Sequence, residues 1–200
     1  MLDAARRRAS ELGIHDVEFR IEDAAALSLA DASVDGILCR WGLMLVPEMD
    51  AAAAEIRRVL RPGGRAALAV WGSPDDNDWM TAPGRSALDL GLVERPDPEA
   101  PGPFRLSADG ALADVLTAAA LSVETVEEVA IVWRSGSLDD WWNAVKDTSR
   151  MLSTLLDRLN PEEGQAVREG AECRLAEWVA PDGSVAVPGV ARVALAARPD

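Results

Sequence analysis

The order of apolar and polar residues along the first 71 positions predicts alternating helices and strands. Apolar residues recur at helical spacing over 2–12 and again over 49–60, where Arg61-Pro62-Gly63-Gly64 ends the second helix. Short apolar runs, each typical of a strand, occur at 17–22, 34–39 and 65–71. Strands that alternate with helices imply a parallel sheet, because each helical crossover returns the chain to the same end of the sheet.

The second half of the chain continues with helices and two longer strands. A segment rich in Pro, Gly and Asp runs from 72 to 102 and has room for one short helix. We then expect a helix from Ser107 and a helical pair whose two members begin at Ser137 and Asn160. Strands are expected at 123–133 and 189–197.

Composition limits the classes of function. The chain has 200 residues, of which 48% are hydrophobic, enough for one domain with a real core. Its formal net charge of −14 disfavours nucleic-acid binding, since an acidic surface repels phosphates. Two distant cysteines and a single histidine exclude a disulfide framework and a multi-histidine metal site within one chain. No apolar run is long enough to span a membrane, so we expect a cytoplasmic protein that binds no metal.

Three segments together resemble a known family. They are VEFRIEDAAALSLADASVDGILCRWGLMLVP at 17–47, EIRRVLRPGGR at 55–65 and AALAVW at 66–71. They resemble the second half of the nucleotide-binding core of class I S-adenosylmethionine-dependent methyltransferases, the subgroup related to ubiquinone and menaquinone biosynthesis enzymes. The resemblance implies an α/β fold, with an incomplete Rossmann-like sheet that is mostly parallel and a last strand that is antiparallel. The family strand order that it implies is 3-2-1-4-5-7-6.

The resemblance also implies a set of cofactor-binding residues. Asp23 follows the first strand, where the family has an acidic residue that accepts the adenine amino group, and the backbone amide of Ala24 would meet a ring nitrogen. Cys39 and Arg40 would offer backbone groups to the methionine part of S-adenosylmethionine, and Trp41 a wall beside its sulfonium. From local sequence alone, a turn-forming or helix-capping role is favoured for Asp23, and the flanking resemblance reverses that preference. For Trp41, packing in the core is an equal alternative.

The resemblance implies methyl transfer to a small-molecule acceptor, and no obligatory catalytic residue is expected because orientation supplies much of the acceleration. A single domain would comprise a partial cofactor-binding core at 1–72, a substrate-side cap at 73–106 and 135–182, and the rest of the sheet at 107–134 and 183–200. The tryptophans of the cap favour a lipophilic substrate, and core packing is the alternative. These tryptophans are Trp79, Trp133, Trp141, Trp142 and Trp178.

Residues 1–200 contain no glycine-rich GxGxG turn of the kind with which the family begins. The sequence is therefore interpreted as a fragment, a start assigned at an internal methionine, or a shortened relative with impaired cofactor binding. The alternatives are a non-catalytic remnant that acts as a binding module and, less favoured, a nicotinamide-dependent dehydrogenase. Without neighbouring strands, the segment 34–39 is expected either to pair with 17–22 or to be left with a bare edge that promotes homodimers.

Overall fold

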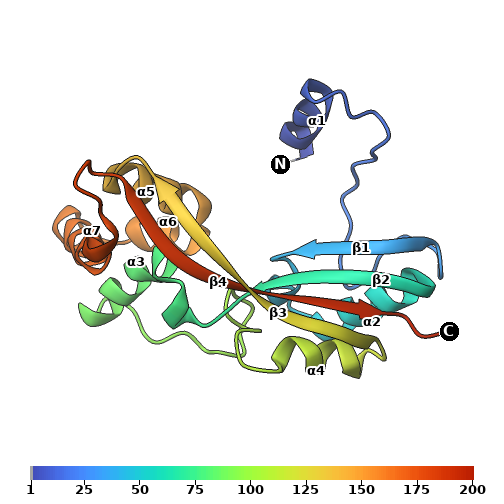
Figure 1. Cartoon of the computed structure of the whole chain (residues 1–200). Coiled ribbons are helices and arrows are strands. Elements are labelled where there is room, and N and C mark those ends of the chain that lie inside the picture. The colour runs from blue at the N-terminus through green and yellow to red at the C-terminus, as the bar shows by residue number, and fades with distance from the viewer. Residues whose placement is uncertain (1) are drawn as a thin grey trace.

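The computed structural model describes residues 2–200, which form a four-stranded sheet with helices around it (Figure 1). The strands are β1 (Val34–Arg40), β2 (Leu60–Trp71), β3 (Ser122–Ser135) and β4 (Val185–Ala197). Their spatial order is β1-β2-β4-β3, with β1 parallel to β2 and β4 antiparallel to both of its neighbours. Three strands therefore run in one direction and β4 alone opposes them. This confirms four of the five predicted strands and the antiparallel last strand, and it reproduces the 4-5-7-6 part of the implied strand order.

The helices lie where the pattern places them, but the first member of the expected helical pair is divided into two, so seven α-helices are found where six were expected. The seven α-helices are α1 (Leu2–Glu11), α2 (Met49–Val59), α3 (Asp78–Asp89), α4 (Ala111–Ala118), α5 (Leu138–Thr148), α6 (Arg150–Leu156) and α7 (Pro161–Arg174). Ser137 and Asn160 cap α5 and α7 as predicted. Gly110, and not Ser107, precedes α4, and the expected short helix of the 72–102 segment is the 12-residue α3.

The strand predicted at 17–22 is wrong. Among the described residues this segment makes no strand ladder, and the only pairing beside it is an isolated bridge between Asp23 and Ala26. The apolar–polar alternation of the segment is typical of a strand, but a strand requires a neighbour with which to exchange backbone hydrogen bonds. Since β1 pairs only with β2, its other edge is bare, which is the second of the two outcomes expected from the sequence.

The turn after α2 ends the helix as predicted, although the strand starts earlier than expected. α2 ends at Val59, and β2 begins at Leu60 and includes the Arg-Pro-Gly-Gly stretch, opposite a register shift in β1. A side chain at Gly64 would place its Cβ 2.9 Å from the Arg61 carbonyl oxygen and 3.0 Å from that of Asp35. Glycine is therefore required here because two backbone segments pass each other closely.

The two faces of the sheet differ in cover. α2 and α4 pack on one face, where Ala66, Leu68 and Val70 of β2 are fully buried. Figure 1 shows both helices beneath the sheet, with α1 standing clear on the other side. β3 and β4 extend beyond the sheet as a twisted ribbon to a group of helices, α3, α5, α6 and α7, which we call the helical lid (Figure 1). No helix within residues 2–200 is both long and apolar enough to cross a bilayer.

Candidate functional site

Three of the predicted site residues follow one another where β1 ends. Cys39 and Arg40 are the last residues of β1, and the Trp41 amide donates a hydrogen bond to the Ala69 carbonyl of β2 at 2.8 Å. Trp41 has a φ of 55°, a left-handed conformation that is unfavourable for a bulky residue. Such a strained backbone persists only where its surroundings hold it, and it is concentrated at binding sites. The carboxyl end of β1 is also where open α/β sheets place their ligands.

Trp41 begins a continuous row of four indole rings, which we call the tryptophan ladder. Its ring stacks on Trp71 with centroids 4.3 Å apart, and Trp71 meets Trp79 edge-on at 5.3 Å. Trp79 then stacks on Trp133 of β3 at 4.6 Å. The ladder joins the end of the β1–β2 pair to the helical lid, since Trp79 belongs to α3. On its outer side, the Trp41 ring lies under the Arg40 guanidinium, whose carbon is 5.0 Å from the ring centroid.

The two ends of the ladder each carry an unpaired hydrogen-bond donor. The Nε1 atoms of Trp41 and Trp133 are buried and have no partner among residues 2–200. The inner indoles differ, because Trp79 Nε1 donates to Asn77 Oδ1 at 3.3 Å, and Trp71 is not among the orphaned donors. Buried donors in proteins are nearly always paired, with protein, water or ligand. The ladder therefore presents two buried N–H groups that an acceptor atom would satisfy.

Asp23 and Ala24 lie in a tight turn well before β1 in the sequence. The Asp23 carboxylate accepts a hydrogen bond from the Ala25 amide at 2.9 Å, and the Asp23 carbonyl accepts one from Ala26 at 3.0 Å. This is an Asx-type turn, the local arrangement that aspartate favours. Both Asp23 and Ala24 are exposed. The second carboxylate oxygen makes no hydrogen bond within the described part of the chain, so an acceptor for a ligand remains.

A clamp on α2 fixes the segment that follows this turn. Arg58 donates to the Leu27 and Leu29 carbonyls at 3.0 and 2.8 Å and to Asp31 at 2.6 Å, while Glu55 accepts from the Leu27 amide at 2.8 Å. Glu55 and Arg58 also pair with each other at 2.6 Å. The Arg58 hydrogen bond lowers the pKa of the Glu55 carboxyl below its ordinary value of 4.5. The clamp thus holds residues 27–31 against α2 and sets the direction in which the earlier residues leave.

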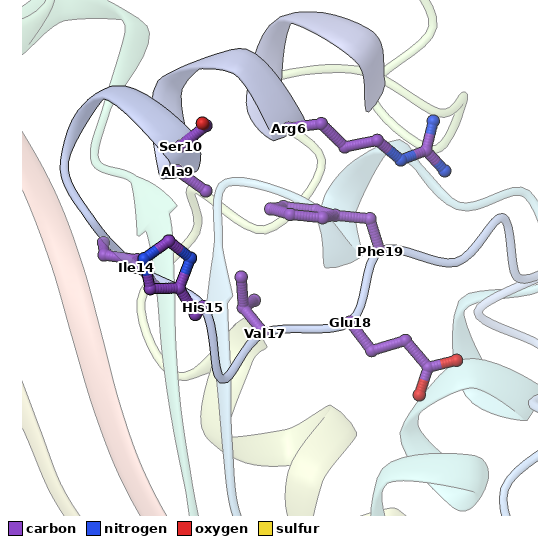
Figure 2. Close-up of a pocket in the computed structure, with 8 residues that line it drawn as sticks. All are labelled: Arg6, Ala9, Ser10, Ile14, His15, Val17, Glu18 and Phe19. Atoms are coloured by element: carbon purple, nitrogen blue, oxygen red, sulfur yellow. The ribbon is translucent and has the colours of Figure 1, made fainter.

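The predicted site residues therefore form two groups, and no hydrogen bond within residues 2–200 links them. Asp23 and Ala24 belong to the turn, while Cys39, Arg40 and Trp41 belong to the end of β1. A separate hollow of about 430 Å³ lies between α1 and residues 14–19. Figure 2 shows the Phe19 ring there beneath Arg6 and Ala9 of the helix. None of the five predicted residues lines that hollow.

The sequence analysis missed two residues that organise this region. Trp71 links the two stacked pairs of the ladder, although its position at the end of the predicted strand 65–71 was a usable signal. Asn77 is fully buried and joins the lid to β4: its amide nitrogen donates to the Ser73 and Val190 carbonyls, and its Oδ1 accepts from the Val190 amide. An asparagine in a Pro- and Asp-rich segment gives no sequence signal of burial.

Comparison with known proteins supports the family resemblance for the first third of the chain. Residues 1–68 match the family model of a methyltransferase domain. The ubiquinone/menaquinone biosynthesis C-methyltransferase of Acidiphilium cryptum is 44% identical over 66 residues, which are 32% of this chain and 26% of that protein. The methyltransferase GfsG of Streptomyces halstedii is 42% identical over 79 residues, 38% of this chain and 28% of that protein. The matched region thus spans about a quarter of these relatives.

Solved structures extend the resemblance in fold to the whole chain. The YcgJ protein of a Bacillus species superposes with a TM-score of 0.58 at 20% identity, covering 100% of this chain and 79% of that one. The [4+2]-cyclase SpnF superposes with a TM-score of 0.53 at 21% identity, covering 98% of this chain and 61% of that one. At these identities the likeness shows the fold alone. The comparisons together confirm the predicted resemblance to methyltransferases, in sequence for residues 1–68 and in fold for the chain as a whole.

Proposed function

We propose that this protein takes part in S-adenosylmethionine-dependent transfer of a methyl group to a small-molecule acceptor. The observation that carries the proposal is the match of residues 1–68 to the methyltransferase domain. That match includes both the Asp23 turn and the end of β1, where Trp41 is held in a strained conformation. Both relatives named above are methyltransferases by name.

The cofactor residues that we propose are Asp23, Ala24, Cys39, Arg40 and Trp41. The free oxygen of the Asp23 carboxylate and the Ala24 amide are an acceptor and a donor, the pair that an adenine edge requires. The backbone of Cys39 and Arg40 lies at the ligand-binding end of the sheet. S-adenosylmethionine supplies a methyl group on a positively charged sulfur. Since Arg40 covers the outer face of Trp41, a cation near that ring requires the guanidinium to move aside.

The acceptor that we propose is small and lipophilic, because the ladder provides an apolar wall with a donor at each end. An apolar wall with few polar groups is typical of small-molecule sites. In the reaction the acceptor's lone pair forms the new bond to the methyl carbon, the carbon–sulfur bond breaks, and any acceptor proton passes to solvent. The chain's contribution is to align the two molecules and exclude water.

We further propose that residues 1–200 alone bind this cofactor weakly. The sequence has no GxGxG turn, whose backbone would otherwise approach the cofactor. A non-catalytic binding module is the second candidate. The fold does not by itself require methyl transfer, since one structural neighbour is named as a [4+2]-cyclase. Because both cysteines are unpaired, the cytoplasm is the compartment that we propose.

Calorimetric titration of the chain with S-adenosylmethionine tests the proposal. We expect measurable but weak binding, which Asp23→Ala weakens about 5- to 150-fold, the effect of about 1–3 kcal/mol for a buried polar partner. Asp16→Ala is the matched control, because Asp16 is also exposed but lies outside the turn. Equal affinities of the wild type and Asp23→Ala would remove Asp23 from the site. No heat at millimolar cofactor, with the chain folded, would favour the binding module.

A further inference from the structure

Residues 2–22 form an arm that packs on itself more than on the sheet. The arm consists of α1 and the extended segment 17–22, and Figure 1 shows it standing apart from the sheet. Val17, Phe19 and Ile21 alternate with charged residues in the extended segment. Of these, Ile21 is 89% exposed. The arm is therefore a helix and a strand-like segment whose apolar side is uncovered.

The sheet lacks the same two kinds of element. Within residues 2–200, β1 hydrogen-bonds only to β2, so its other edge exposes unpaired backbone groups. The face opposite α2 and α4 is open, and its apolar centre is bordered by Arg40, Arg65 and Glu127. Residues directly opposite one another in a ladder share a face, which places on it Leu38, Ala67, Ala69, Val193 and Leu195. Leu38, at the margin of this face, is 88% exposed.

The chain cannot easily place its arm on its own β1 edge. Glu22 accepts a hydrogen bond from the Ser28 amide at 2.9 Å, and Asp23 forms its own turn with Ala25. The clamp of Glu55 and Arg58 then fixes residues 27–31 against α2. These bonds set the exit direction of the arm away from the sheet. A second copy of the chain has no such restriction.

We propose that two copies of this chain exchange their arms. The 17–22 segment of each copy adds a strand to the β1 edge of the other, and α1 covers the open face that contains Leu38. Such an exchange is isologous, so each dimer contains the contact twice and both β1 edges are paired within it. Arg6, Arg7 and Arg8 of α1 are the only run of three basic residues in a chain of net charge −14, which favours approach of α1 to another copy.

Arm exchange does not depend on methyl transfer. The oligomeric state of single-residue variants tests it. We expect the wild type to be a dimer by light scattering coupled to size-exclusion chromatography. Ile21→Asp alters only the arm and Leu38→Asp only the receiving face; each is expected to raise the dimer dissociation constant at least about 100-fold, because each dimer loses two apolar contacts. Met151→Asp is the matched control: Met151 is 67% exposed in α6, outside the proposed contact, and the variant is expected to remain dimeric.

Mixing the two variants distinguishes exchange from any other dimer. The arm of Leu38→Asp is intact and so is the receiving face of Ile21→Asp, so the mixture is expected to form heterodimers through one intact contact. Since both side chains are exposed in the single chain, neither substitution is expected to lower its melting temperature. A monomeric wild type at all concentrations would overturn the proposal. So would a Leu38→Asp chain that dimerises like the wild type, or a mixture that stays monomeric.

Discussion

At the scale of single residues, the most informative side chains are polar groups buried at junctions. Asn77 is fully buried where the lid meets β4. Its side chain donates a hydrogen bond to the Val190 carbonyl and accepts one from the Val190 amide. It also accepts from Trp79 Nε1, a member of the tryptophan ladder. One amide side chain therefore positions both a strand and a ring of the proposed substrate wall.

Replacing this amide is expected to cost more than any surface change. In Asn77→Ala the Val190 amide and the Trp79 indole lose their acceptor while they remain buried, at about 1–3 kcal/mol for each orphaned group. We therefore expect the free energy of unfolding to fall by about 2–4 kcal/mol in urea titrations. Asn143→Ala, at an exposed position of α5, is the control and should stay within about 0.5 kcal/mol of the wild type. Similar losses in the two variants would contradict the role assigned to Asn77.

At the scale of elements, helix ends and strands that a local pattern predicts agree with the structure. Features that require a partner remote in sequence were not predicted correctly. The N-caps of α5 and α7, the end of α2 and the four strands from β1 to β4 follow from periodicity and turn residues within a few positions. The segment 17–22 has the alternation of a strand, but pairing depends on a neighbour that is remote in sequence. For the same reason, the sequence could single out Asp23 and Trp41 as candidate site residues. It could not predict that Trp71 stacks on Trp41 or that Trp133 stacks on Trp79.

The clamp between α2 and residues 27–31 gives a prediction about acid. Arg58 holds the pKa of Glu55 below its ordinary value of 4.5, so the ionised form stabilises the fold. That stability is complete above the unfolded-state pKa, near pH 4.5, and is lost as pH falls through the lower folded-state pKa. Wild type should therefore be more stable than Glu55→Gln at pH 7, and the difference should shrink below pH 4.5. Thermal melts across pH 3–7 measure it, with the exposed Glu99→Gln as control. A difference that is constant with pH would contradict the clamp.

At the scale of the whole molecule, the tryptophan ladder joins the β1–β2 pair to the helical lid. Trp41 and Trp71 stack with an interplanar angle of 8°, and Trp79 and Trp133 with one of 5°. Each pair is less than 5 Å apart, and indole transitions that lie so close together couple with each other. The β3–β4 ribbon also runs from the sheet to the lid, and Asn77 hydrogen-bonds to it at Val190 (Figure 1). The ladder is thus a reporter on how the two parts are held together.

We expect this coupling to appear as a paired positive and negative band in the far-ultraviolet circular dichroism spectrum. Trp41→Leu should remove the contribution of the first stacked pair and leave that of the second, whereas Trp178→Leu, outside the ladder, should preserve both.

On heating, the ladder bands and the helical signal should disappear in one coincident transition, because Asn77 and the ladder bind the lid to the sheet. Loss of the ladder bands at a lower temperature than the helical signal would show instead that the lid separates from the sheet before either part unfolds.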